Sequence, residues 1–183
     1  MKSVLIVVDM LNDFCHKHGV LSHTLTDPKK LYAKGIISKV KAMVDSFRGA
    51  KSPIIWLCDN HDKDDLEFKR FPPHAVKGTW GAEIIASLDP LKSLTSHYER
   101  VITKTRYSGF HNTDLAFHLG HLSPVTVHVV GVCTSICVMD TVGGLANRDI
   151  PVNVIRGCVA DFDPEAHINA LARMEQLYGA KIL

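Results

Sequence analysis

The stretch Val4–Val8 (VLIVV), followed at once by Asp9, decides the fold of this chain. A strand with one face toward water alternates apolar and polar side chains, whereas a strand buried on both faces is apolar throughout. Val4–Val8 therefore predicts a strand inside a parallel sheet. The run is too short for the apolar core of a signal peptide, because Asp9 interrupts it. Parallel strands are joined through long crossovers, so we expect helices to alternate with strands along the chain.

Strand-like and helix-like segments do alternate in the rest of the sequence. Further strands are expected at residues 53–58, 100–104, 125–131 and 151–155, and helices at 28–49, 82–88, 112–121, 134–147 and 164–178. The first helix should begin with Asp27 as its N-cap and Pro28 at its first position. This order predicts the α/β class: a single domain over residues 1–183, with three α/β/α layers and a mainly parallel central sheet of about five to six strands.

The composition excludes several classes of protein. Of the 183 residues, 46% are hydrophobic and 22% are charged, which is typical of a globular domain and not of a disordered chain. The net charge of +2 comes from interspersed charges, so a nucleic-acid partner is not expected. No apolar run reaches the roughly 18 residues that a membrane span needs. The five cysteines form no CxxC pair, and their odd number indicates reduced thiols in a cytoplasmic protein.

Reactive side chains follow four of the expected strands. Asp9 comes after the first strand and Asp59 after the second, Lys104 ends the third, and the turn 131–137 follows the fourth. In open parallel sheets, ligands bind beyond the carboxyl ends of the strands. Any one of these residues could simply cap an element or face solvent. Their combination predicts a functional site at this edge of the sheet.

Cys137 lies in the first turn of the helix expected to begin at Thr134. A helix N-terminus lowers the pKa of a thiol and favours the nucleophilic thiolate. Lys104 could stabilise that thiolate, and Asp9 could accept its proton. Burying an unpaired charge is costly, so Asp9 and Lys104 should be paired. These residues predict a set of nucleophile, base and cation, with a cysteine that merely packs in the core as the alternative.

A second set of polar residues lies in and before the long polar loop 60–80, a length that is usually functional. Asp59, His61, Glu67 and His74 offer imidazole and carboxylate ligands, which suit zinc, iron or manganese. The same residue types fill many solvated loops. Their spacing alone therefore leaves both a metal site and an ordinary polar loop open.

Taken in order, these segments resemble the nicotinamidase/isochorismatase family of cysteine hydrolases, closest to its metal-binding nicotinamidase (pyrazinamidase) branch. The matching stretches are VVDMLNDF (7–14), the D-x-H at 59–61, FPPHAVKGTWGAEI (71–84), KTRYSGF (104–110) and GVCTSICV (131–138). The resemblance covers roughly residues 3–160. It implies an isochorismatase-like hydrolase fold and a homo-oligomer, either a dimer or a tetramer.

The resemblance also implies the roles of the residues at the strand ends. It assigns Asp9, Lys104 and Cys137 as the catalytic triad. It places the backbone N–H groups of Cys133 and Cys137 in an oxyanion hole, beside a cis peptide bond between Val132 and Cys133.

For the loop, the resemblance implies one divalent metal ion, zinc before iron or manganese. Its ligands would be Asp59, His61 and His74, joined by Glu67. The substrate would contact Phe14, Phe71 and Tyr107. The implied activity is that of a metal-dependent cysteine amidohydrolase, which converts a small carboxamide, nicotinamide before others, to the acid and ammonia through a thioester.

Four positions depart from the pattern of many nicotinamidases. Leu11 replaces Gln, Asn60 replaces Trp, Asp65 replaces the second His of the loop, and Phe71 replaces Trp. We expect these changes to reshape the mouth of the pocket and to leave the triad intact. They keep open a hydrolase of another amide, a ureido compound or a vinyl ether on the same fold. A non-catalytic protein that binds metal or reacts through its thiol is the alternative from another class.

Overall fold

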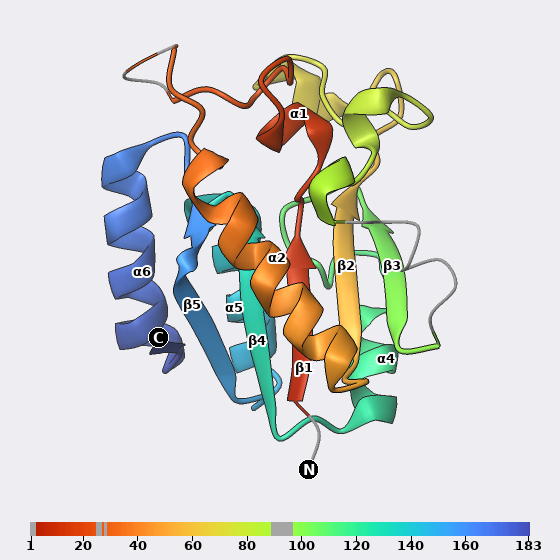
Figure 1. The fold of residues 1–183 in the computed structure, drawn as a ribbon, viewed down its shortest axis with the longest axis vertical. Coiled ribbons are helices and arrows are strands. Elements are labelled where there is room, and N and C mark those ends of the chain that lie inside the picture. Colours follow the sequence, from red (N-terminus) through yellow and green to blue (C-terminus); the bar gives the residue numbers. More distant parts are fainter. Residues whose placement is uncertain (1–2, 25–26, 28, 89–96) are drawn as a thin grey trace.

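The computed structural model describes residues 3–24, 27, 29–88 and 97–183. Its centre is a parallel sheet with the strand order β3-β2-β1-β4-β5-β6 (Figure 1). The strands are β1 (Ser3–Val8), β2 (Ile54–Asp59), β3 (Glu99–Lys104), β4 (Thr126–Val132), β5 (Val152–Ala160) and β6 (Lys181–Ile182). The helices are α1 (Asn12–Cys15), α2 (Lys34–Gly49), α4 (Leu115–Leu122), α5 (Met139–Ala146) and α6 (Pro164–Tyr178). The predicted class and strand number are confirmed, and all the strand pairs are parallel.

The strand β1 lies between β2 and β4 and is buried on both faces, as its sequence predicts. Leu5 and Val7 belong to the core on one side of the sheet, and Val4, Ile6 and Val8 belong to the core on the other side. The uninterrupted apolar run is therefore explained by burial of both faces.

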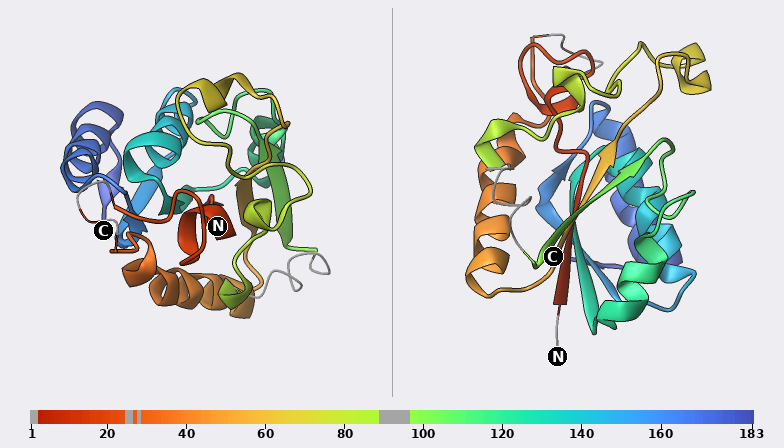
Figure 2. Two further views of the ribbon diagram at one scale, coloured as in Figure 1. Left: turned by 90° about the horizontal axis from the view of Figure 1, so that it is seen from above. Right: turned by 90° about the vertical axis from the view of Figure 1, so that its right-hand side faces the viewer.

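Helices cover both faces of the sheet and complete the three layers. The helix α2 packs on one face, with Ile36, Val40 and Val44 in the same core as Leu5 and Trp56. The helices α4, α5 and α6 contribute to the opposite core, so α2 lies on one face of the sheet and these three on the other (Figure 2). None of the helices in the described ranges is long and apolar enough to cross a membrane.

The order of the strands creates the place for a site. From β1 the chain proceeds to β2 and β3 on one side, and β4, β5 and β6 follow on the other side of β1. The direction in which strands are added therefore reverses between β1 and β4. At such a switch point the loops separate beyond the carboxyl ends of the strands and leave a crevice. The loop segments 9–24 and 60–85 lie over this edge, at the top of Figure 1.

The first long helix begins later than the sequence predicts. The helix α2 starts at Lys34, and Pro28 lies outside the described residues. The side chain of Asp27 does accept a hydrogen bond from the N–H of Lys29, but this closes a turn only. The backbone next pairs back, because Tyr32 N–H donates to the carbonyl of Ser22. This tertiary pairing replaces the helical hydrogen bonds of the first turns.

The prediction of a helix at residues 82–88 is wrong. The chain forms two short 3₁₀ turns, Trp80–Ala82 and Ala86–Leu88, with extended backbone between them. There, the carbonyl of Glu83 accepts from Asn12 N–H, and Ile85 N–H donates to the carbonyl of Met10. Pairing with the segment after β1 fixes this stretch and delivers it to the site.

The remaining boundaries are close to the predictions. The helix α6 has the predicted bounds, with Asp163 as its N-cap. The strand β5 continues past residue 155 to Ala160, and the short strand β6 at the end of the chain was not predicted. The helix after β4 does begin at Thr134, but as one π-helical turn, Thr134–Val138, that runs into α5.

Candidate active site

Asp9, Lys104 and Cys137, here called the thiol cluster, meet at the carboxyl ends of the strands. Lys104 Nζ lies 2.8 Å from Asp9 Oδ2 and 3.4 Å from Cys137 Sγ. All three side chains are buried, and none comes from the same element as another. The structure thus brings together the three residues that the sequence singled out as nucleophile, base and cation.

Asp59 is a fourth member of this charge arrangement. Its Oδ1 lies 2.5 Å from Lys104 Nζ, so the ammonium is held between two carboxylates. The N–H of Asp59 donates to Asp9 Oδ1 at 2.8 Å. This bond anchors Asp9, whose φ of 46° lies in the left-handed region that few residues other than glycine adopt. Buried ions at such short distances stabilise one another only because every charge has a partner.

Burial controls the proton affinities of the thiol cluster. It raises the pKa of Asp9 to about 6, with Asp59 acting in the same direction and Lys104 opposing. Burial also raises the pKa of the Cys137 thiol well above its usual range, and Lys104 only partly offsets this. The thiol pKa is therefore raised and not lowered as expected, because burial outweighs the groups that favour the thiolate. The resting pair is a neutral thiol beside a carboxylate that is ionised at neutral pH.

The turn between β4 and α5 carries the residues expected to supply the oxyanion hole. The peptide bond between Val132 and Cys133 is cis, as the resemblance implied. The π-helical turn then places Cys137 on the site, with Val138 N–H donating to the carbonyl of Cys133.

Asp161 braces this turn and was missed at the sequence level. Its Oδ2 accepts from Ser135 N–H at 2.7 Å, and its side chain is buried. Nearby, Nδ1 of His167 lies 2.8 Å from Thr134 Oγ1. The signal that could have identified Asp161 is its position directly after β5, but the sequence placed the end of that strand too early.

Asp59, His61, Glu67 and His74, here called the ligand cluster, lie beside the thiol cluster. Ligand atoms of Asp59, His61 and His74 all lie within 4.8 Å of one another. Glu67 is outside that group but next to it, with Oε1 at 3.9 Å from His74 Nε2. All four side chains are buried, which is unusual for carboxylates and imidazoles in a loop.

Two buried atoms of the ligand cluster, His61 Nε2 and Glu67 Oε2, have no hydrogen-bond partner among the described residues. Such atoms are costly unless something binds them. Burial would lower the pKa of His61, but Asp59 and Asp65 outweigh it and raise that pKa to about 9. Asp59 and Asp65 thus place carboxylates on both sides of His61. These ligand types, their burial and the unpartnered atoms fit a divalent metal ion.

A second group with metal-binding residue types, Asp9, Asp59 and Cys137, is explained without an ion. Lys104 Nζ contacts each of the three, so the ammonium already supplies the positive charge. The metal prediction thus concerns the ligand cluster alone.

His74 is held in place through its neighbour. Asp13 Oδ2 accepts from Ala75 N–H at 2.8 Å, and Ala75 has a φ of 43°. His74 Nδ1 lies 2.8 Å from the carbonyl oxygen of Pro72, which leaves Nε2 directed toward Glu67. Asp13 was not singled out from the sequence, because no local pattern shows that its carboxylate meets a residue 62 positions away.

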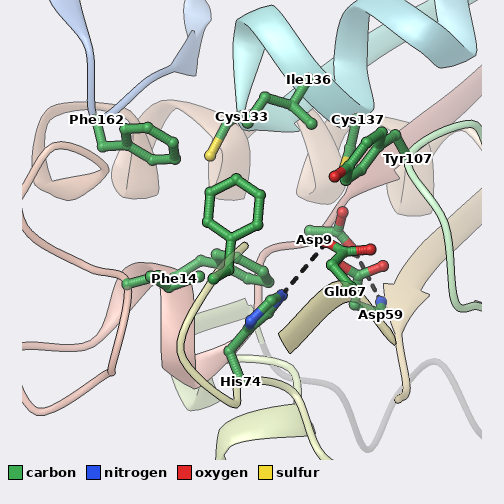
Figure 3. Close-up of a pocket in the computed structure, with 12 residues that line it drawn as sticks. Asp9, Phe14, Asp59, Glu67, His74, Tyr107, Cys133, Ile136, Cys137 and Phe162 are labelled. Carbon is green, nitrogen blue, oxygen red and sulfur yellow. Dashed lines mark hydrogen bonds and ion pairs between the residues drawn. The ribbon is translucent and has the colours of Figure 1, made fainter. Parts of the chain in front are cut away.

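A pocket opens above both clusters (Figure 3). Its lining consists of Asp9, Phe14, Leu21, Asp59, Glu67, Phe71, His74, Tyr107, Cys133, Ile136, Cys137 and Phe162. All three predicted substrate contacts, Phe14, Phe71 and Tyr107, are therefore at the pocket. The ring of Phe14 packs edge-on against His74, with centroids 5.4 Å apart. Leu21, Ile136 and Phe162 were not predicted, because no motif marks an apolar side chain in a loop.

The comparisons with known proteins agree with this architecture. A family model described as the isochorismatase domain matches residues 3–183. The chain belongs to the isochorismatase family. It is an isochorismatase-family amidohydrolase, a hydrolase of amide C–N bonds, on a fold that solved members share.

Two solved structures and one curated protein show the range of similar family members. The crystal structure of the nicotinamidase/pyrazinamidase PncA from Bacillus subtilis has a TM-score of 0.90 and 32% identity, over 100% of this chain and 99% of that chain. The pyrazinamidase of Pyrococcus horikoshii, crystallised in complex with zinc, has a TM-score of 0.85 and 29% identity over 100% and 99%. The ureidoacrylate amidohydrolase RutB of Methylobacterium radiotolerans is 26% identical, over 96% of this chain and 74% of its own length.

We expected all four departures from the nicotinamidase pattern to reshape the mouth of the pocket, but only one of them lies in its described lining. Phe71 lines the pocket, whereas Leu11 is fully buried and bridges to Ile84 away from it. Asn60 is not part of the described lining. Asp65 lies behind the ligand cluster, where its Oδ2 is 3.0 Å from His61 Nδ1.

Proposed function

We propose that this family member is a metal-dependent cysteine amidohydrolase that converts nicotinamide to nicotinate and ammonia. One observation carries the proposal: Asp59 of the ligand cluster contacts Lys104 of the thiol cluster, and both clusters open into one pocket. A nucleophile beside a site for a divalent ion suits a substrate with a carboxamide and a second, metal-binding atom. Nicotinamide has both, and its flat ring suits the aromatic walls of Phe14, Phe71 and Tyr107.

Asp9, Lys104 and Cys137 would carry out the acyl transfer. Asp9 accepts the thiol proton as the sulfur of Cys137 attacks the carboxamide carbon, and Lys104 stabilises the negative charge that develops on sulfur. The pKa of Asp9 is raised to about 6, so its carboxylate is ionised at neutral pH. A pKa this close to the working pH lets one group first accept and later donate a proton. The backbone N–H groups of Cys133 and Cys137 would hold the oxyanion, an effect of about 3 kcal/mol per donor in other acyl-transfer enzymes.

The proton then moves to the leaving group. Protonated Asp9 donates to the amide nitrogen, the C–N bond breaks, and ammonia leaves a thioester on Cys137. Asp9 next takes a proton from water, whose oxygen attacks the thioester carbon. The C–S bond breaks, the thiol of Cys137 regains the proton, and the acid is released. The sum is one amide and one water converted to one acid and one ammonia.

Asp59, His61, Glu67 and His74 would hold the metal ion, with zinc the proposed occupant. When bound, the ion supplies a Lewis-acid site for the pyridine nitrogen, which orients the carboxamide toward the thiol. Phe14 and Phe71 pack edge-on against His74. These two rings would restrict the pyridine ring of the substrate to one plane and exclude water from the ligand cluster.

The test is ammonia release from nicotinamide by the purified protein, measured as isolated, after removal of metal by a chelator, and after zinc is restored. Release that is lost with the metal and regained with zinc supports the proposal, and Cys137→Ala should remain inactive in every state. No release by protein shown to contain zinc would overturn nicotinamide as substrate.

A ureido compound is the second candidate, because the relatives include a ureidoacrylate amidohydrolase. That substrate carries a carboxylate, whereas the described pocket lining contains Asp9, Asp59 and Glu67 and no arginine or lysine. A neutral amide therefore fits the pocket better than an anion. Vinyl-ether cleavage is disfavoured for a different reason, since it needs no thiol nucleophile. Parallel assays with ureidoacrylate and nicotinamide distinguish the first two.

A further inference from the structure

We propose that Asp65, clamped by Arg106, is a positioning residue that orients His61 and Glu67 for metal binding. The inference rests on the metal site of the proposed function and extends it to residues outside the pocket. Asp65 is one of the four positions at which this chain departs from the pattern of many nicotinamidases.

Asp65 contacts two members of the ligand cluster at once. Its Oδ2 lies 3.0 Å from His61 Nδ1, and its Oδ1 accepts from Glu67 N–H at 2.9 Å. The second contact caps the 3₁₀ helix Leu66–Lys69 on which Glu67 is carried. One carboxylate thus fixes both a ring orientation and the start of the element that presents the next ligand.

Arg106 holds that carboxylate from the other side. Its Nη1 lies 3.0 Å from each oxygen of Asp65. Arg106 follows Lys104 by two positions, so the same chain segment that supplies the cation of the thiol cluster also fixes the support of the ligand cluster. The Asp65 side chain is 7% exposed and Arg106 is 35% exposed, so the pair is shielded but still reaches the surface.

The contact with His61 has a chemical consequence for metal binding. A carboxylate accepts hydrogen bonds only, so Asp65 keeps a proton on Nδ1 and leaves Nε2 as the ligand atom. Nε2 is the buried atom without a hydrogen-bond partner among the described residues, and it lies 3.7 Å from Asp59 Oδ2, another ligand of the cluster. The carboxylate also raises the basicity of the imidazole, which strengthens it as a ligand.

The same geometry argues that Asp65 acts through His61 and not as a ligand. Its carboxylate contacts Nδ1, whereas the atom that faces Asp59 is Nε2. The group of converging ligand atoms contains Asp59, His61 and His74, and Asp65 is not a member. Loss of a supporting carboxylate of this kind typically weakens metal affinity by about 10–100-fold.

The experiment measures zinc dissociation constants without substrate, by competition with a chromogenic chelator. The proteins are the wild type, Asp65→Ala, Asp65→Asn and Arg106→Ala. Asp64→Asn is the matched control, because Asp64 is an exposed carboxylate on the same loop. The thermal midpoint of each metal-free protein is recorded, so that a general loss of stability is recognised.

We expect Asp65→Ala to weaken zinc binding by about 10–100-fold. Asp65→Asn should fall between the wild type and Asp65→Ala, because an amide oxygen still accepts from Nδ1 but carries no charge. Arg106→Ala should weaken binding less than Asp65→Ala, and Asp64→Asn should match the wild type. In the cobalt-substituted Asp65→Asn protein, the absorption spectrum should indicate the same coordination number of the cobalt ion as in the wild type.

Wild-type zinc affinity in folded Asp65→Ala and Arg106→Ala would overturn the inference and leave the proposed function standing. If Asp65→Ala does not fold, unchanged affinity in Asp65→Asn and Arg106→Ala together has the same meaning. A cobalt spectrum that shows one ligand fewer in Asp65→Asn would also overturn it, since Asp65 would then be a ligand. Absence of zinc binding by the wild type would overturn the metal site itself.

Discussion

The thiol cluster and the ligand cluster differ in how their buried charges are balanced. In the thiol cluster, Lys104 lies between Asp9 and Asp59 and contacts the sulfur of Cys137, so its cation is part of the protein. In the ligand cluster, carboxylates surround His61, and buried polar atoms of His61 and Glu67 have no partner among the described residues. In the first cluster the cation is built in, whereas the second has buried ligand atoms that fit an added cation.

Both clusters are buried, so burial alone does not identify a metal site. Asp59 lies in two sets of ligand-type atoms close enough to hold an ion, one with His61 and His74 and the other with Asp9 and Cys137. What separates them is whether a protein cation already occupies the centre. A buried carboxylate paired with lysine is satisfied, whereas a buried imidazole nitrogen without a partner is not. The first arrangement suits covalent chemistry and the second suits substrate positioning.

The largest expected effect is on the thiol cluster. Cys137→Ala should reduce amide hydrolysis by at least about 10⁴-fold, because nothing else in the cluster can form the thioester. The matched control is Cys158→Ala, since Cys158 is also a buried thiol but lies in β5 away from the pocket. Activity is measured as ammonia release. Equal losses in the two variants would indicate a structural and not a chemical role for Cys137.

Lys104→Met tests whether the internal cation balances the cluster. It leaves the carboxylates of Asp9 and Asp59 buried without their ammonium, and we expect a loss of about 3–5 kcal/mol in the free energy of unfolding. Chemical denaturation of the metal-free protein measures this loss. Lys63→Met, at an exposed lysine, should change stability by less than about 0.5 kcal/mol. An equally small loss of stability in Lys104→Met would show that Lys104 is not needed to balance the buried carboxylates.

His74→Ala acts on the ligand cluster and should affect binding before chemistry. Removing a ligand should weaken zinc binding and raise KM by about 10–100-fold, the range known for loss of supporting groups in metal sites, with a smaller change in kcat. Steady-state kinetics at saturating zinc separates the two parameters. A lower kcat with unchanged KM would mean that the ligand cluster contributes to bond cleavage and not to positioning.

The smallest expected effect is the pH dependence of the thiol cluster. Burial raises the pKa of Asp9 to about 6, and Asp9 must be ionised to accept the thiol proton. The value of kcat/KM should therefore fall as pH decreases through about 6, by about tenfold for each unit well below it. Zinc content is measured at each pH, so that loss of metal is not mistaken for protonation of Asp9. A midpoint near 4, the value of an ordinary aspartate, would exclude this role for the buried carboxylate.

Much of the architecture was accessible from the sequence because burial leaves a simple pattern there. The apolar run of β1 predicted a central strand, and the helix predicted at 164–178 was found with those bounds. Predictions failed where backbone partners are distant in sequence. Residues 83–85 look helical in isolation but pair with residues 10–12, and residues 30–32 pair back on 22–24.

The same division holds for the candidate site. The sequence by itself determined which reactive residues stand at the strand ends, because parallel topology brings those ends to one edge. Only the tertiary structure decided that the Cys137 thiol is shielded and has a raised pKa, that Lys104 is shared with Asp59, and that Asp65 supports His61. The physical reason is that pairing joins groups far apart in the sequence: Lys104 lies 33 positions from Cys137 and 45 from Asp59. Asp65 is only four positions from His61, but Arg106, which holds it, is 41 positions away. Local sequence patterns do not encode such distances.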